Sequence, residues 1–141
     1  MPNIDAQDLA TRFVAMWNEP DPGLRRKAIE DLWAEQATHV LHPPQEIREV
    51  AAGLGFASST LEARGHDAIE SRVTRSYEDF VAAGTITFRA RAGAAIRLNN
   101  VVKLVWEVVT VAGEEVQGGG LDLLILGDDG RIEQDYMFPG L

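Results

Sequence analysis

The sequence contains no cysteine. This absence excludes disulfide bonds, thiolate nucleophiles and cysteine-ligated metal sites. A chain without cysteine suits a reducing compartment, and we expect the protein to be cytoplasmic. The first residues, Met1 to Asp5, contain neither a basic stretch nor an apolar run, so we do not expect a secretory signal.

Positive charge is scarce as well. Lysine and arginine total 13 against 22 aspartates and glutamates, which gives a formal charge of −9. Such a surface repels phosphate backbones and anionic lipids, so we expect no nucleic-acid partner and no membrane partner. Apolar runs also stay well short of the roughly 18 residues that a membrane-spanning helix needs. The chain does have a hydrophobic fraction of 45% in 141 residues, which predicts one domain, residues 1–141, with a substantial core.

Motifs for metals and nucleotides are missing too. The three histidines, His39, His42 and His66, show neither an HExxH pattern nor a two-histidine, one-carboxylate pattern. The glycine run 118–120 does not precede a predicted helix, so it is not a phosphate-binding loop. We therefore expect neither a metal ion nor an organic cofactor.

Helical spacing dominates the beginning of the chain. Apolar residues between 4 and 17 recur about every 3.6 positions, and Asp5 is placed to cap the helix that they form. Proline and glycine in 18–23 end this helix. Asp21 is placed to cap a second helix, whose apolar stripe runs over residues 24–33.

The next segment is less regular. Residues 38–42 have the pattern of a short strand, which the prolines at 43–44 end. Residues 43–65 are mixed, and within them 46–52 form either a short helix or part of a loop. A third helix is predicted from about 67 to 82, because apolar side chains again recur at helical spacing.

Strands fill the C-terminal half. Alternation of apolar and polar residues predicts strands at 85–91, at 102–111 within the longer run 96–112, at 115–126 and at 131–138. Three helices followed by an antiparallel sheet indicate an α+β fold. The glycines at 118–120 would weaken a flat strand, so we expect a sharp bend or a bulge there, or a close approach of another backbone or a ligand.

Asp122 lies in the middle of the most apolar of these strands. Side chains alternate between the two faces of a strand, so Asp122 shares a face with Leu124 and Leu126. If that face is the interior, burial disfavours the charged carboxylate and raises its pKa. Enzymes use this situation to keep an acid protonated near neutral pH. The alternative is an inert aspartate, hydrogen-bonded near a sheet edge.

Several short motifs together resemble a known superfamily. Residues 33–38 lead into the first strand, residues 65–69 open the third helix, and Gly120-x-Asp122 is followed by six residues and then by Asp-Gly-Arg-Ile at 129–132. This order resembles the NTF2-like superfamily in its SnoaL-like branch, over about residues 8–138. The resemblance implies an NTF2-like cone, in which three N-terminal helices pack on a strongly curved antiparallel or mixed sheet that encloses a pocket. Members include ketosteroid isomerases, polyketide cyclases, epoxide hydrolases and dehydratases, so the fold alone does not fix the function.

Comparison with ketosteroid isomerases suggests roles for particular residues. Asp122 stands nine residues before Arg131, which resembles the position of the acid that stabilises the oxyanion in those enzymes. Their catalytic base precedes a proline at the end of the first strand, where this chain has His42. Phe13 replaces their tyrosine and has no hydroxyl to donate. The resemblance therefore implies His42 as base and Asp122 as acid, with machinery that differs from steroid isomerisation.

Further residues are candidates for the pocket. By the same resemblance Asp135 is a second carboxyl that points into the cone, and its alternative is an exposed edge residue. Asn100 is either a donor to a substrate carbonyl or a turn residue, while His39 falls on the opposite strand face from His42 and is expected to be solvated. The predicted substrate-binding residues are Asn100, Trp106, Phe13, Trp17, Tyr77, Leu104, Leu124 and Met137.

Two classes of function remain open at this point. The first is a cofactor-independent enzyme that acts by proton transfer on a small, mostly apolar carbonyl compound or epoxide, as an isomerase, cyclase, dehydratase or epoxide hydrolase. The second is a non-catalytic module that holds an apolar ligand or serves in assembly. In either case we expect a homodimer through the sheet, because Val101, Val105, Val109 and Val111 would make its outer face too apolar for free exposure.

Overall fold

In a computed structural model, which describes residues 2–55 and 61–140, two helices begin the chain. They are α1, Ala6–Asn18, and α2, Pro22–Leu32. Asp5 and Asp21 cap them as predicted, each accepting a hydrogen bond from a backbone N–H three residues later, at 3.3 and 3.0 Å. Within the described residues no helix is long and apolar enough to cross a membrane.

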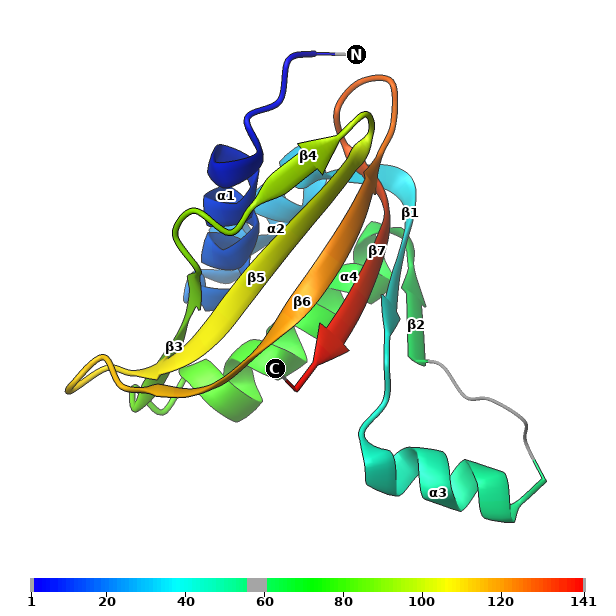
Figure 1. Cartoon of the computed structure of the whole chain (residues 1–141), viewed down its shortest axis with the longest axis vertical. Helices are drawn as coiled ribbons and strands as arrows, with labels where there is room; N and C mark the ends of the chain where they lie inside the picture. The colour runs from blue at the N-terminus through cyan, green and yellow to red at the C-terminus, as the bar shows by residue number, and fades with distance from the viewer. Residues whose placement is uncertain (1, 56–60, 141) are drawn as a thin grey trace.

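Two further helices follow. The ambiguous segment contains α3, Gln45–Gly53, and the predicted third helix is α4, Gly65–Ser76. A π-helical turn, Tyr77–Val81, extends α4. Figure 1 shows α1, α2 and α4 on one side of the sheet, with α3 standing apart from them. No residue of α3 is buried, whereas α4 buries Ile69 and Val73.

The sheet has seven strands in the order β2-β1-β7-β6-β5-β3, with the short β4 also paired to β5. The pair β1 and β7 is parallel, and the other pairs are antiparallel. The sheet is not closed, and with the helices it forms the expected α+β NTF2-like cone. The strands are β1 Trp33–Leu41, β2 Leu61–Arg64, β3 Ile86–Ala90, β4 Ile96–Leu98, β5 Val101–Thr110, β6 Val116–Leu126 and β7 Ile132–Pro139.

The core lies between the helices and the inner face of this sheet. Phe13 from α1 and Trp33 from β1 are fully buried with their ring centroids 5.9 Å apart. Burial of such large aromatic surfaces is a major source of stability. The inner face of the sheet is lined by the buried residues Val102, Leu104, Asp122, Leu124, Leu126, Ile132, Asp135 and Met137.

The glycine run in β6 has two structural consequences. Val109 pairs with Val116 and Val108 with Gly118, so Gln117 is an extra residue and forms the predicted bulge. Farther along, a Cβ atom on Gly120 would lie 2.2 Å from Cζ2 of Trp106. Gly120 therefore leaves the space in which the Trp106 indole crosses β6. The predicted close approach of a backbone lies at Gly119, where a Cβ atom would be 2.5 Å from the carbonyl oxygen of Trp106.

Candidate functional site

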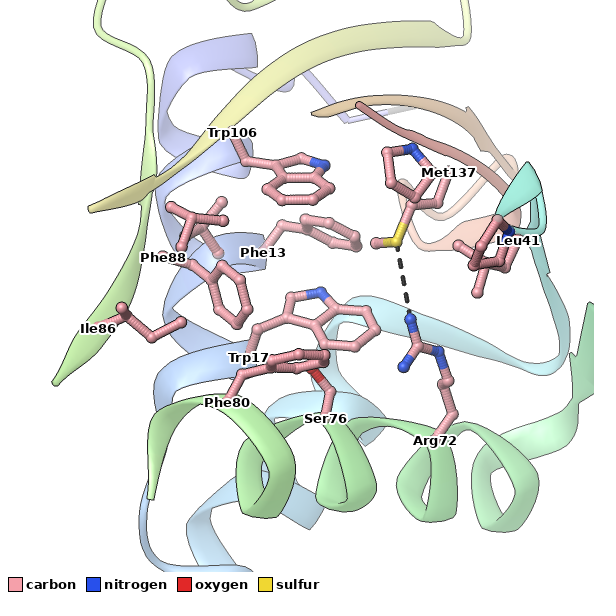
Figure 2. A pocket seen from close by; sticks show the side chains of 14 residues that line it. Phe13, Trp17, Leu41, Arg72, Ser76, Phe80, Ile86, Phe88, Trp106 and Met137 are labelled. Atoms are coloured by element: carbon pink, nitrogen blue, oxygen red, sulfur yellow. Dashed lines mark hydrogen bonds between the residues drawn. The ribbon is translucent and has the colours of Figure 1, made fainter. Parts of the chain in front are cut away.

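A cavity of about 450 Å³ lies between α1, α4 and the inner face of the sheet. This volume is within the usual range for small-molecule sites. Figure 2 shows aromatic side chains from α1, β3 and β5 around it, with Arg72 and Ser76 rising from α4. Its described lining is Phe13, Val14, Trp17, Leu41, Pro44, Arg72, Ser76, Phe80, Ile86, Phe88, Trp106, Val108, Met137 and Pro139.

Two carboxyl groups are buried together behind this wall. Asp122 and Asp135 are both 0% exposed. Asp122 pairs with Met137 across β6 and β7, and Leu124 pairs with Asp135. The two aspartates are therefore diagonal neighbours on one face, where long side chains can interact. Their carboxyl groups are in hydrogen-bonding contact when one of them carries a proton.

Each carboxyl also has a second partner. The indole Nε1 of Trp106 donates to Oδ1 of Asp122 at 2.7 Å. On the other side, Nδ1 of His39 lies 2.6 Å from Oδ2 of Asp135. His39 is only 2% exposed, and its ring packs 5.7 Å from the ring of Trp17. A continuous polar chain thus crosses the inner face of the sheet, from β5 through β6 and β7 to β1.

Burial shifts the pKa values of the three titratable groups in this hydrogen-bonded row, Asp122, Asp135 and His39. Desolvation raises the pKa of Asp122 well above its usual value, and the neighbouring Asp135 raises it further. Desolvation also raises the pKa of Asp135, to about 7. The pKa of His39 is lowered to about 4 by burial first and then by the positive charge of Arg72.

These pKa directions favour one hydrogen-bond assignment when the pair carries a single negative charge. In it, Asp122 keeps its proton and donates to the Asp135 carboxylate, and neutral His39 donates its Nδ1–H to that same carboxylate. The two carboxyls then share one proton and one negative charge, as expected for close carboxyl pairs. The cluster therefore holds an acid and a carboxylate base side by side, with Nε2 of His39 as a further acceptor.

Five buried polar atoms of this region have no hydrogen-bond partner among the described residues. They are Nε1 of Trp17, Nε2 of His39, Nε of Arg72, Oδ2 of Asp122 and Oδ1 of Asp135. Buried polar groups without partners are costly and rare. Their concentration in one place marks this region as a candidate site.

His42 does not lie where the sequence analysis placed it. The prediction put His42 inside the cone and His39 in solvent, whereas His39 is buried and His42 is exposed beyond the end of β1. The inner face of β1 carries Ala37, His39 and Leu41, so position 42 has the opposite parity. The ring of His42 packs against Phe138 on the outside, at 5.9 Å.

Of the other predicted pocket residues, some line the cavity, some are buried in the core, and two lie outside the cavity lining. Phe13, Trp17, Trp106 and Met137 line the cavity. Leu104 and Leu124 are fully buried beneath it in the core.

Asn100 and Tyr77 lie elsewhere. Asn100 is exposed, and its side chain donates to the carbonyl of Leu126 at 3.4 Å. Tyr77 packs under the guanidinium of Arg25, whose carbon is 4.6 Å from the ring centroid. Neither residue is in the described lining of the cavity, and these contacts fit the alternative roles, a turn residue for Asn100 and helix packing for Tyr77.

Two site residues were missed at the sequence level, His39 and Arg72. Arg72 stands in α4 between Ile69 and Val73, both of which point inward. Residues three apart on a helix share a face, so the position of Arg72 relative to Ile69 was an available signal. For His39 the signal was its pairing with Asp135, which appears only when β1 and β7 lie side by side.

The arrangement of strands and helices has close structural parallels. A proposed isomerase of the SnoaL-like family from Agrobacterium tumefaciens superposes with a TM-score of 0.74 and 21% identity, over 96% of this chain and 97% of that chain. The chain has the NTF2-like fold. No protein-family model and no curated protein matches it by sequence.

Other NTF2-like structures agree with this assignment of the fold. A SnoaL-like protein of unknown function from Burkholderia thailandensis gives a TM-score of 0.63 at 13% identity, over 99% of this chain and all of that one. A protein with a ketosteroid isomerase-like fold from Catenulispora acidiphila, solved with trimethylamine, gives 0.59 at 17% identity over 97% and 88%. At these identities the likeness establishes the NTF2-like fold and leaves the activity to the site.

Proposed function

We propose that this chain is a cofactor-independent acid–base enzyme for a small, mostly apolar carbonyl compound or epoxide. The observation that supports this proposal is the buried Asp122–Asp135 pair behind a mainly apolar cavity wall. Burial raises the pKa of both carboxyls, which favours retention of a proton by the pair. Proton-transfer catalysis needs an acid and a base within reach of one substrate, and pKa values near neutrality make both efficient.

The geometry suggests a division of roles. Asp122 is the acid that donates to a developing oxyanion, or to an opening epoxide oxygen. The base is the Asp135 carboxylate, whose pKa of about 7 suits proton transfer near neutral pH, and His39 positions it through its Nδ1–H. This assignment replaces His42 with Asp135, which His39 holds in place. The apolar wall excludes water and strengthens each of these interactions.

Access to the carboxyls requires movement of the wall. Asp122 and Asp135 are not among the lining residues. Trp106, which donates to Asp122, and Met137, which pairs with Asp122 across the strands, form the cavity wall in front of them. Met137 is unbranched and has several rotatable bonds, so its side chain can move without a backbone change. We expect substrate binding to shift Met137 and bring the polar group of the ligand to the carboxyls.

The test is deuterium exchange and epoxide opening. The purified protein is incubated in deuterated buffer with small cyclic ketones, and α-proton exchange is followed by NMR; styrene oxide is assayed for diol formation. We expect acceleration over buffer that falls at least tenfold in Asp122→Asn, Asp135→Asn and His39→Gln, consistent with typical acid–base contributions of about 10²–10⁴. Asp128→Asn, an exposed aspartate after β6, is the matched control.

The second candidate is a non-catalytic binding module. It is favoured by the separation of both carboxyls from the cavity wall, which is mainly apolar. If ketones and epoxides bind to the cavity but neither exchange nor opening exceeds the buffer rate, this candidate replaces the enzyme.

A further inference from the structure

Arg72 differs from Arg25, the buried arginine among the described residues. Arg25 is 3% exposed and well satisfied, because its guanidinium donates to the carbonyls of Glu19 and Pro20 and to Oγ1 of Thr74. It also stacks on Tyr77. The fold thus gives a buried guanidinium strong acceptors where it serves packing.

The half-buried Arg72 has no such set of acceptors. Its Nη2 lies 3.9 Å from Sδ of Met137, a weak acceptor, and its Nε is buried without a partner among the described residues. The guanidinium carbon is 5.2 Å from the ring centroid of Trp17, which fixes its plane beside the cavity. Among the described residues no carboxylate oxygen comes within 4.0 Å of its nitrogens. A guanidinium held in this way keeps most of its donors available.

Ser76 adds a second donor on the same face of α4. It stands four residues after Arg72, so the two side chains are neighbours along the helix, and both line the cavity. Figure 2 shows both rising from α4, Ser76 close to the rings of Phe80 and Trp17, and Arg72 beside Trp17 with its guanidinium toward Met137. A planar guanidinium beside a hydroxyl matches the geometry of a carboxylate, which accepts two parallel hydrogen bonds from an arginine.

We propose that Arg72 and Ser76 bind the carboxylate of an amphipathic ligand whose apolar body fills the aromatic cavity. This inference builds on the proposed function and names the substrate class: a carbonyl compound or epoxide that also carries a carboxylate. Phe13, Trp17 and Phe88 then contact the apolar body, and the carboxylate supplies the acceptors that Arg72 lacks. The reacting group of the ligand is left to face Asp122.

The test is equilibrium binding of matched probes. The probes are 4-phenylbutanoate and 4-phenylbutanamide, which share an apolar body and differ in the charge of the head group. Binding is measured by calorimetry and by the fluorescence of Trp17 and Trp106 in the cavity wall. We expect the carboxylate to bind about 10 to 100 times more tightly than the amide, as charge-assisted hydrogen bonds allow.

Variants show which residues produce the preference for the carboxylate probe over the amide probe. In Arg72→Met the ratio of the two affinities should fall to about one. In Arg72→Lys the ratio should fall part of the way, since lysine keeps the positive charge but cannot donate two parallel hydrogen bonds to one carboxylate. Ser76→Ala should lower the ratio less than Arg72→Met does. Arg75→Met is the control, because Arg75 lies one turn away in an exposed pair with Asp79 and should leave the ratio unchanged.

The binding results test the carboxylate site, and the exchange kinetics test the proposed catalytic activity independently. Equal binding of both probes to the wild type, or a preference that persists in Arg72→Met, overturns the carboxylate site while leaving proton transfer to be judged by exchange kinetics. If Arg72→Met does not fold, Arg72→Lys and Ser76→Ala decide the matter by the same ratio. No binding of either probe at millimolar concentration overturns the inference as well.

Discussion

At the scale of single residues, Gly120 shows how a missing side chain positions a functional group. The indole of Trp106 occupies the space that a Cβ atom would take, and from there its Nε1 reaches Oδ1 of Asp122. The same indole face lines the cavity. One glycine therefore supports both the wall and the hydrogen bond of the candidate acid.

Gly120→Ala should displace the Trp106 indole and break its hydrogen bond to Asp122. We expect a loss of about 1–3 kcal/mol in the free energy of unfolding, the usual range for overpacking. Urea melts of the variant measure this loss. The matched control is Gly118→Ala, since a Cβ at Gly118 has no heavy atom within 4 Å; equal effects of the two substitutions would contradict the packing account.

Asp122→Asn should change stability in a pH-dependent way. A raised carboxyl pKa in the folded state stabilises the protein at low pH, and this contribution is lost as pH rises above the unfolded value of about 3.9. Because the variant lacks this carboxyl, its stability relative to the wild type should increase from pH 4 to pH 8. Thermal melts across this range check the direction, and a difference that stays constant with pH would show a carboxyl with an ordinary pKa.

For His39→Gln, stability relative to the wild type should change with pH in the opposite direction. The pKa of His39 is lowered to about 4 in the folded state, so the histidine stabilises the protein above the unfolded value of about 6.5 and this contribution is lost as pH falls toward 4. Relative to the wild type, the variant should therefore lose stability as pH rises from 4 to 6.5. Melts of both variants in the same buffers make the two slopes directly comparable, and slopes of the same sign would contradict the assigned protonation states.

At the scale of elements, α3 differs from the other helices because it lacks a packing partner among the described residues. Ile47, Val50 and Leu54, on and just after it, are 44%, 64% and 73% exposed. Helices in proteins are stabilised mainly by burial of an apolar face. We therefore expect α3 to contribute little to the stability of the isolated chain.

Substitutions in α3 and α4 test this expectation. Val50→Ser should change the free energy of unfolding by no more than about 0.5 kcal/mol, as for ordinary surface positions. Ile69→Ala, in the buried face of α4, should cost about 2–5 kcal/mol. Chemical denaturation at one protein concentration measures both, and a large loss from Val50→Ser would show that α3 packs on something in solution.

The same elements show what the sequence could and could not predict. The caps at Asp5 and Asp21, the strand pattern around Asp122 and the glycine bulge were predictable because each depends on neighbouring residues. His39 and His42 were exchanged because the role of His42 rested on the resemblance to ketosteroid isomerases. The parallel pairing of β1 with β7 sets His39 against Asp135, and this pairing joins strands far apart in the sequence, so local alternation alone does not reveal which face is inward.

At the scale of the whole molecule, apolar side chains from three strands meet on the outer face of the sheet. Val105 pairs with Leu121, which pairs with Phe138, so three apolar side chains form one row across β5, β6 and β7. Leu123 and Tyr136 pair in the adjacent row. Of the valines first assigned to this face, Val109 is buried.

We expect this outer face to be covered by a second copy in solution. Light scattering at micromolar concentration should give the mass of a dimer, and Leu121→Lys should shift it toward the monomer because the new charge would be buried in the interface. Asp128→Lys, away from this face in the turn after β6, is the control. A monomer mass for the wild type would exclude the dimer.

The two edge strands of the sheet affect how readily the protein forms fibrils. The strands at the ends of the order, β2 and β3, have four and five residues and carry Glu62, Arg64 and Arg89. Short, charged edges are poor templates for strand addition by further chains. Open sheets with long, uncharged edges are prone to fibril growth, and neither edge strand of this sheet has these properties. Concentrated samples should therefore remain negative for thioflavin T as long as the fold persists.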